Sequence, residues 1–159
     1  MVGSIETYMH QHSVARFWER YRVTNAWAPS EPPVAEHFCD NQTDADACAH
    51  LVLVGIKQAT ASALASYEED GEPVPTSGKL TIVTNWVGEP KALIRTHTVT
   101  ICRFGDIPPE FATLEGEGDG TLAWRRETHR AFWERSLPMH IIDDDLLVVC
   151  EKFELVATA

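Results

Sequence analysis

The chain lacks several patterns that would assign it a function directly. No apolar run among its 159 residues approaches the roughly 18 residues that a membrane-spanning helix needs. Its four cysteines form no Cys-x-x-Cys pair, and no His-Glu-x-x-His sequence is present. We therefore expect reduced thiols, with no metal site and no other cofactor. The first twelve residues have neither the basic start nor the apolar middle of a signal peptide, which predicts a cytoplasmic protein without a membrane partner.

Positive charge is also scarce. The chain has 13 lysines and arginines against 24 aspartates and glutamates, a formal net charge of −11. Proteins that wrap nucleic acid without sequence preference usually have a basic surface. Any contact with nucleic acid must therefore be local, in a cleft that takes one nucleotide or a short single strand. A nucleoside or another small molecule fits this charge balance better.

The size and composition of the chain predict one globular domain with a single active cleft. Hydrophobic spacing and capping residues predict helices over residues 13–23, 43–55, 108–114 and 121–135. Runs rich in β-branched residues predict strands over residues 60–65, 79–86, 91–103 and 146–156. The acidic segment 67–73 is predicted to be a solvated loop. Since strands and helices do not alternate regularly, we expect an α+β fold with a mainly antiparallel, barrel-like sheet.

Capping residues and helical spacing predict where two of these helices begin and which side of the last one faces inward. We expect Thr43 to begin the second helix, with acidic residues in its first turn. Thr121 is expected to cap the last helix. The helical spacing predicts that one set of side chains in that last helix faces inward: Leu122, Trp124, Thr128, Ala131 and Phe132.

The segment from Gly55 to Ser62 is the most informative part of the chain. It places Lys57 where an apolar helix ends and a strand of small and β-branched residues enters the core. Lysine is seldom buried unless a partner or a function requires it, because removing its charge from water is costly. Lys57 is therefore the first candidate for a functional residue.

Several short motifs occur together with this lysine. They are Gly55-Ile56-Lys57-Gln58-Ala59-Thr60, the acidic signature Glu115-Gly116-Glu117-Gly118-Asp119-Gly120, Trp124-Arg125 with His129, and Val149-Cys150-Glu151-Lys152-Phe153. In this combination the chain resembles the ASCH domain, named for homology to an activating signal cointegrator. The resemblance spans about residues 45–156.

This resemblance implies a small β-barrel of the pseudouridine-synthase-associated (PUA-like) type, with about five to six mainly antiparallel strands surrounded by helices. The domain would comprise residues 43–159. Residues 1–42 would add an N-terminal helix and a proline-rich connection that packs on it. Members of the family have been linked to RNA binding, to ribonuclease action and to removal of the acetyl group from N4-acetylcytidine.

The acetylcytidine hydrolases of the family use a lysine, a threonine three residues later and a glutamate from the acidic signature. The matching positions here are Lys57, Thr60 and Glu117, which implies a metal-independent hydrolase. Ser62 stands where those enzymes carry an arginine. We include Ser62 among the expected substrate-binding residues.

The chemistry of these three residues leaves their roles open. The Thr60 hydroxyl could attack an amide or orient a water molecule, and it needs a base to take its proton. Lys57 could be that base, which burial favours and the Glu117 carboxylate opposes, or it could stabilise an oxyanion. Glu117 could pass a proton to the leaving amine. On RNA, Glu117 could instead activate a ribose 2′-hydroxyl while Lys57 stabilises the phosphate.

Residues for binding single-stranded RNA or a nucleoside are also predicted. Tyr67, Trp86 and Trp124 are candidates for stacking on a base, and Arg125 and His129 belong to the basic cluster of the chain. Each has an ordinary structural interpretation, since Trp124 could lie in the core and the arginines could pair with neighbouring glutamates. A non-catalytic module that binds RNA or a nucleotide is accordingly the alternative function.

Overall fold

The structure, a computed structural model, describes residues 2–159, with side chains from residue 9 onward. The chain forms two compact units. The first contains the segment ending at Gly55, Leu80–Arg95 and Leu155–Ala159, and the second contains Ile56–Lys79 and Thr96–Glu154. Strands β4 (Pro90–Arg103) and β5 (Leu147–Thr158) each contribute residues to both units.

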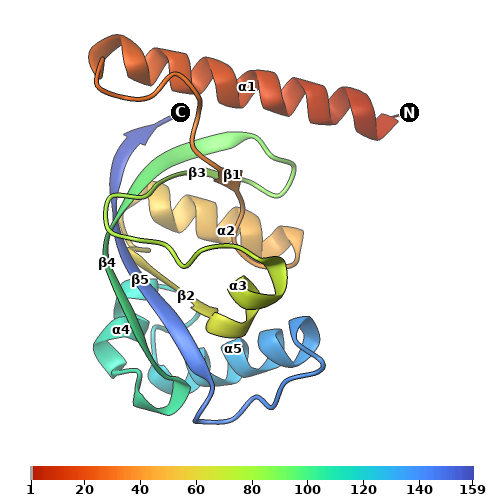
Figure 1. Cartoon of the computed structure of the whole chain (residues 1–159), viewed down its shortest axis with the longest axis vertical. Coiled ribbons are helices and arrows are strands. Elements are labelled where there is room, and N and C mark those ends of the chain that lie inside the picture. The colour runs from red at the N-terminus through yellow and green to blue at the C-terminus, as the bar shows by residue number, and fades with distance from the viewer. Residues whose placement is uncertain (1) are drawn as a thin grey trace. The chain divides into compact units, whose positions relative to one another are not determined.

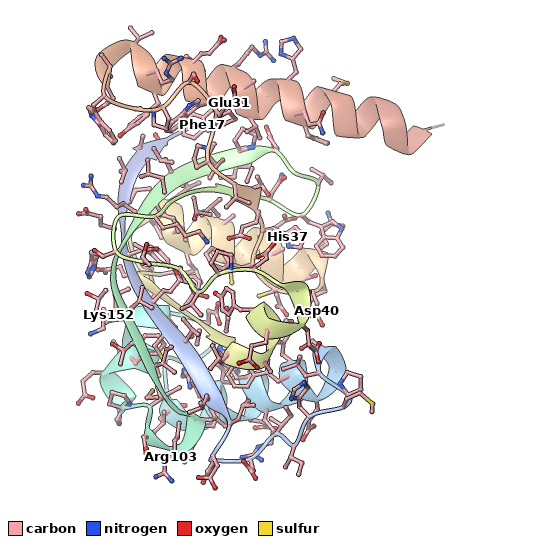
Figure 2. The ribbon with its side chains drawn as sticks, viewed as in Figure 1. Phe17, Glu31, His37, Asp40, Arg103 and Lys152 are labelled. Atoms are coloured by element: carbon pink, nitrogen blue, oxygen red, sulfur yellow. The ribbon has the colours of Figure 1, made fainter. Side chains whose placement is uncertain are left out.

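The first unit is built around the helix α1 (Val2–Thr24), which packs on strands β3 (Leu80–Thr84) and β4 (Figure 1). Phe17, Trp18 and Tyr21 of α1 are buried against Ile82 and Leu93 of these strands. Figure 2 labels Phe17, which points from the helix toward the sheet. Burying large aromatic side chains is the dominant apolar contribution to such a core. The indole nitrogen of Trp18 donates a hydrogen bond to the Pro29 carbonyl at 3.0 Å. This bond holds the proline-rich connection to the helix.

Helix α2 (Gln42–Leu53) also belongs to the first unit. Its N-cap is Asn41, whose side-chain oxygen accepts from the Asp44 backbone N–H at 3.0 Å. The predicted start at Thr43 was therefore one residue late, because the asparagine before the helix already provides the cap. The short strand β1 (Ala35–Glu36) pairs in parallel with β3, and β3 pairs antiparallel with β4.

The second unit contains strand β2 (Ala59–Ala63) and the helices α3 (Leu64–Asp70), α4 (Pro109–Glu115) and α5 (Leu122–Ser136). A 3-10 turn, Phe104–Asp106, follows β4. Strand β2 pairs antiparallel with β5. Small side chains of β2 and larger ones of the helices share an apolar core made of Ala59, Ala63, Phe104, Ile107, Phe111, Trp133, Leu137 and Val148.

The hydrogen-bonded order of the strands is β1-β3-β4-β5-β2. The predicted α+β class with a mainly antiparallel sheet is confirmed. With β1 and β2 at its two ends, the ladder is not closed into a complete barrel. The terminal strands therefore leave backbone groups that other parts of the chain must satisfy.

Further local predictions were wrong in α3 and α5, and α1 begins well before the predicted residue 13. The segment predicted as an acidic loop contains most of α3, which ends at Gly71 in the left-handed conformation. Glutamate is a good helix former and a glycine in that conformation is a common helix end, so the acidic composition did not exclude a helix. In α5, Arg125 and Trp133 are the buried residues, while Thr128 is exposed. The prediction counted an arginine as a surface residue, which shifted the inward side of the helix.

Candidate functional site

Lys57 lies in the short chain segment that connects the end of α2 to the start of β2, and its side chain is almost completely buried. Its ammonium nitrogen Nζ lies 2.8 Å from Oε1 of Glu117. Nζ also donates hydrogen bonds to the carbonyl of Ala59 at 2.8 Å and to that of Glu115 at 3.5 Å. A lysine ammonium carries three N–H donors and no acceptor. The acceptors described around Nζ therefore suit the donor capacity of this side chain.

The Ala59 carbonyl needs this partner because β2 is a terminal strand of the sheet. Residues of an antiparallel strand direct their backbone groups alternately toward and away from the neighbouring strand. The Gln58 carbonyl accepts from the Phe153 N–H of β5, so the carbonyl of Ala59 points away from β5. Lys57 thus has a structural role at the sheet edge in addition to its contact with Glu117.

Glu117 is positioned by a glycine-rich loop whose shape depends on two close contacts. Gly116 and Gly118 have φ values of 67° and 57°, in the left-handed region that disfavours other residues. A Cβ atom on Gly116 would lie 2.7 Å from the Ile56 side chain, and one on Gly118 would lie 2.1 Å from the Trp124 ring. Trp124 therefore packs directly on the loop backbone, one residue from Glu117.

The residue before this loop, Glu115, forms a buried charged network with α5. Its Oε2 accepts a hydrogen bond from Nε of Arg125, and both side chains are about 2% exposed. The Arg125 guanidinium lies over the Phe111 ring at 5.3 Å. Nη1 and Nη2 of Arg125 are buried and have no hydrogen-bond partner among the described residues. This buried pair is therefore only partly satisfied.

His129, one turn further along α5, extends the same network. Its Nδ1 lies 3.0 Å from the Arg125 carbonyl, which can only accept, so Nδ1 carries a hydrogen. Nε2 lies 3.2 Å from Oε1 of Glu115, without the alignment of a hydrogen bond. Two of the three predicted binding residues on α5, Arg125 and His129, thus contact Glu115, while Trp124 packs on the glycine-rich loop.

Thr60 lies in β2, where it is paired directly with Glu151 of β5. Directly opposed residues in antiparallel strands project from the same face of the sheet, with Cβ atoms about 4.5–5.5 Å apart. Ser62, two residues later, projects from this face as well. The opposite face of β2 carries Ala59, Ala61 and Ala63 and packs into the apolar core. Thr60 and Ser62 are only half-buried.

Glu151 was not predicted as a site residue, although it lies at the centre of this polar face. Its Oε2 accepts a hydrogen bond from the Thr96 hydroxyl at 3.0 Å, and its Oε1 accepts one from the Tyr67 hydroxyl at 3.4 Å. Glu151 and Thr96 are both buried. The sequence contained a signal for this residue, because Val149, Glu151 and Phe153 alternate along a strand in which a buried position carries a charge.

The remaining predicted binding residues are placed differently. Tyr67, on α3, reaches the polar face through Glu151. Trp86 belongs to the first unit, where its ring packs against that of His37 at 4.8 Å and its backbone N–H donates to Asp46 at 2.9 Å. In all, the second unit contains Lys57, Thr60, Ser62, Tyr67, Glu117, Trp124, Arg125 and His129.

All four cysteines are free thiols, and they lie in two close pairs. The sulfur atoms of Cys39 and Cys48 are 3.7 Å apart in the first unit, and those of Cys102 and Cys150 are 3.9 Å apart in the second. Burial and the neighbouring Cys102 raise the pKa of the Cys150 thiol to about 12. Cys150 therefore remains protonated at neutral pH.

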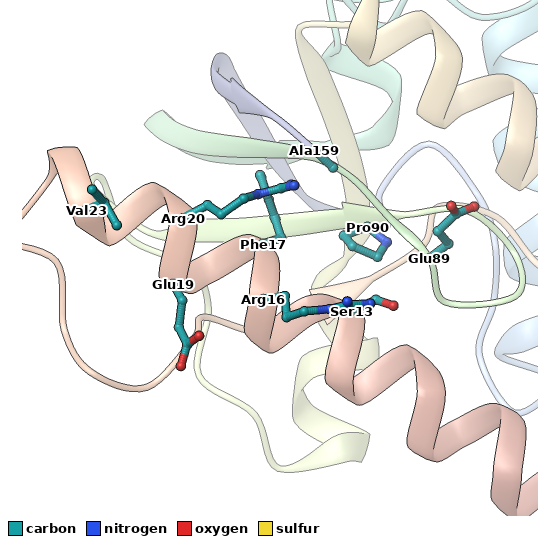
Figure 3. Close-up of a pocket in the computed structure, with 9 residues that line it drawn as sticks. All are labelled: Ser13, Arg16, Phe17, Glu19, Arg20, Val23, Glu89, Pro90 and Ala159. Carbon is teal, nitrogen blue, oxygen red and sulfur yellow. The ribbon is translucent and has the colours of Figure 1, made fainter.

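The first unit has a surface groove of about 680 Å³ between α1, the start of β4 and the end of the chain (Figure 3). Arg16 and Arg20 line it together with Glu19, Glu89 and the terminal Ala159. A hydrogen bond and the charge of Lys91 hold the pKa of Glu89 below its usual range. The groove thus combines both signs of charge, which gives it no preference for phosphate.

Comparison with known proteins identifies the fold family. The model of the ASCH domain matches residues 33–157 of the chain. This chain belongs to the ASCH domain family. ASCH domains in general bind RNA. The match begins ten residues before the boundary expected at residue 43, and no curated protein matches the chain.

Two solved structures resemble this ASCH domain over almost its whole length. The crystal structure of an ASCH domain from Lactobacillus crispatus JV V101 is 34% identical, with a TM-score of 0.84, and covers 91% of this chain and 94% of its own. A crystal structure of a protein from Enterococcus faecalis V583 is 28% identical, with a TM-score of 0.86, and covers 93% of this chain and 90% of its own. In residues 2–159, no helix is long and apolar enough to cross a bilayer.

Proposed function

We propose that this ASCH domain is a metal-independent hydrolase that removes an acyl group from the exocyclic amine of a modified nucleoside such as N4-acetylcytidine. One observation carries the proposal: a buried lysine ammonium lies 2.8 Å from a carboxylate, three residues before a half-buried threonine hydroxyl. Amide hydrolysis requires a proton acceptor, an activated oxygen nucleophile and a donor for the oxyanion. Glu117, Thr60 and Lys57 are of the right chemical types for these roles.

The contacts of Lys57 favour one assignment of roles over the other. The acceptors around its Nζ suit Lys57 as a charged donor and not as a base. Its longest contact is the one to the Glu115 carbonyl at 3.5 Å, and we assign the N–H of that contact to the oxyanion. Glu117 then takes a proton from the attacking water or from the Thr60 hydroxyl and passes it to the leaving amine. In the net reaction, water cleaves the C–N amide bond. The products are the nucleoside amine and acetate.

Charge favours a neutral amide over a phosphodiester as the substrate. Thr60 is paired directly with Glu151, so a second carboxylate lies on the side of the sheet from which the threonine projects. A phosphate group would be repelled by this carboxylate, while a neutral acylated base would not. Cleavage of single-stranded RNA, with Glu117 as the base and Lys57 beside the phosphate, is the second candidate reaction because it uses the same ion pair.

The test compares the wild type with Lys57→Met, which keeps much of the side-chain length but removes the charge. We expect the wild type to release acetate from N4-acetylcytidine, and a chelator should not inhibit it. In the variant the rate should fall at least about 100-fold, the typical cost of losing one oxyanion donor. Liquid chromatography of cytidine and acetate measures the turnover. Lys152→Met is the matched control, since this lysine lies on the neighbouring strand opposite Ala59.

Each outcome distinguishes the candidates. Equal turnover by wild type and Lys57→Met, with circular dichroism confirming that both are folded, would exclude the proposed mechanism. Cleavage of single-stranded RNA in place of acetate release would favour the ribonuclease. If neither substrate is converted and RNA binding is weakened by Lys57→Met, the domain is a non-catalytic binding module.

A further inference from the structure

Glu151 is a buried carboxylate that the proposed hydrolysis does not use. Only 8% of the residue is exposed. Among the described residues its partners are the hydroxyl groups of Thr96 and Tyr67, and none is a cation. The two buried cationic residues of the second unit have other partners, since Lys57 pairs with Glu117 and Arg125 with Glu115. A buried carboxylate without a cation is costly to maintain, which suggests that it has a role in binding.

Glu151 shares its face of the sheet with side chains that are partly exposed. Thr60, Ser62 and Tyr67 are half-buried, whereas Glu151 and Thr96 are buried. The buried carboxylate is therefore bonded to a residue, Tyr67, that is itself partly exposed. A carboxylate has about four lone-pair positions, and the two hydroxyl donors occupy one on each oxygen. The Thr96 hydrogen bond at 3.0 Å orients the carboxylate, and the longer Tyr67 contact at 3.4 Å limits its rotation, which gives the remaining lone pairs preferred directions.

We propose that Glu151 reads the base of the substrate by accepting an N–H group from its exocyclic amine, so that the site prefers a cytosine-type base to uracil. This inference rests on the proposed function, which makes a nucleoside the substrate. Carboxylates accept from the cytosine N4 amine, whereas uracil presents a carbonyl oxygen at the same position. An N4-acyl group leaves one N–H on that nitrogen, so the acylated base offers the same donor.

The same contact accounts for the two hydroxyl partners. A carboxylate that rotates freely turns away from the carbonyl oxygen of uracil, so it discriminates poorly between cytosine and uracil. Thr96 on β4 donates to one carboxylate oxygen and Tyr67 on α3 to the other, so two elements of the unit restrict the rotation of the group. Selectivity then follows from a fixed acceptor that meets either a donor or another acceptor on the base.

Binding of cytidine and uridine, followed by NMR titration at millimolar concentration, tests the inference without turnover. We expect the wild type to bind cytidine about tenfold more tightly than uridine. Glu151→Gln, whose carboxamide can donate to a carbonyl, should lose this preference or shift it toward uridine. The matched control is Glu154→Gln, which removes a charge from an exposed position of the same strand and should leave the ratio unchanged.

A second variant, Tyr67→Phe, removes one hydroxyl donor and leaves the carboxylate in place, so it remains informative if Glu151→Gln fails to fold. It should reduce the cytidine preference without reversing it. The inference is overturned if the folded wild type binds neither nucleoside or binds both equally. It is also overturned if folded Glu151→Gln and Tyr67→Phe keep the wild-type ratio of cytidine to uridine affinity.

These results separate the inference from the proposed hydrolysis. If the cytidine preference depends on Glu151 but the protein does not convert N4-acetylcytidine, recognition of the base by Glu151 is supported and the proposed hydrolase is excluded. If turnover depends on Lys57 but the ratio of cytidine to uridine affinity does not change in Glu151→Gln, the hydrolase is supported and recognition of the base by Glu151 is excluded.

Discussion

The two units of the molecule differ in what they bury. In the first unit the buried side chains are apolar or carry hydroxyl groups, such as Trp18, Ile82 and Thr81. In the second unit a comparable apolar core is accompanied by Lys57, Glu115, Arg125 and Glu151, which are the buried charged residues among those described. Buried charges contribute little net stability and are often retained at functional sites. This difference is why we place the proposed hydrolysis in the second unit and treat the first as its scaffold.

The largest effect should come from breaking the buried pair of the second unit. Arg125→Met leaves Glu115 buried without its guanidinium partner, and we expect a loss of about 3–5 kcal/mol of unfolding free energy. Combining it with Glu115→Leu should recover most of this loss, because replacing both charges with apolar groups is often neutral or stabilising. Urea denaturation of the single and double variants measures both values.

A core substitution in the first unit provides the contrast. Trp18→Ala removes a buried ring and should cost a similar amount, about 3–5 kcal/mol, through the cavity it leaves. If the double variant recovers the unfolding free energy that Arg125→Met loses, that loss came from leaving the Glu115 charge unpaired. If Glu115→Leu does not rescue Arg125→Met, the network stabilises the second unit by packing, and the contrast between the units disappears.

An intermediate effect is expected in the loop that carries Glu117. Gly118→Ala would place a Cβ atom 2.1 Å from the Trp124 ring at a φ of 57°, and we expect it to cost about 1–3 kcal/mol and to reduce turnover by displacing Glu117. Gly120→Ala is the matched control. It has a φ of 74° but no atom within 4 Å of the added Cβ.

Gly120→Ala should therefore show the backbone cost alone, about 1 kcal/mol, with turnover preserved. Thermal unfolding and kinetics of the two variants separate backbone strain from the contact with Trp124. Equal turnover in both variants would mean that the packing of Trp124 on Gly118 does not position the loop.

The smallest effect concerns the thiols. Because burial and Cys102 raise the pKa of Cys150 from 9.0 to about 12, its thiol should react with iodoacetamide much more slowly at pH 8 than the more exposed Cys39. The raised value also means that folded Cys150 holds its proton more tightly than the unfolded chain does. Its contribution to stability is complete below about pH 9 and declines as the pH rises toward 12.

Peptide mass spectrometry after timed alkylation reports the order in which the thiols are modified. Denaturation at pH 8 and at pH 10 measures how the stability depends on the ionisation of Cys150. Modification of Cys150 as fast as Cys39 in the folded protein would show that this part of the second unit opens readily. The interior of the second unit would then be less protected than its burial indicates.

Local signals explain which parts of the fold could be predicted. Thr121 was predicted to cap α5, and its hydroxyl accepts from the Trp124 N–H at 3.2 Å, because a cap depends only on residues within one turn. The aromatic spacing of α1 predicted its buried side for the same reason. The helix α3 was missed because composition suggested a loop, while its end at Gly71 depends on backbone conformation.

The candidate site was only partly accessible to sequence reasoning. Lys57 and Glu117, which are sixty residues apart in the chain, were associated through resemblance to a family, and the structure places them 2.8 Å apart. The assignment of catalytic roles to them and to Thr60 stays a prediction. Glu151 and Glu115 were missed because an acidic residue in a strand or at a helix end is ordinarily exposed. Nothing local to either residue says that it is buried.

The amino-acid sequence by itself determined the helices with strong spacing, the strands rich in β-branched residues, the acidic charge balance and the membership of the ASCH family. Tertiary structure alone decided that Glu151 lies opposite Thr60 and that Arg125 is buried against Glu115. Periodicity and capping act within a few residues along the chain. Burial, pairing register and the proximity of charges depend on segments that meet only after folding, because strand pairing brings distant residues together.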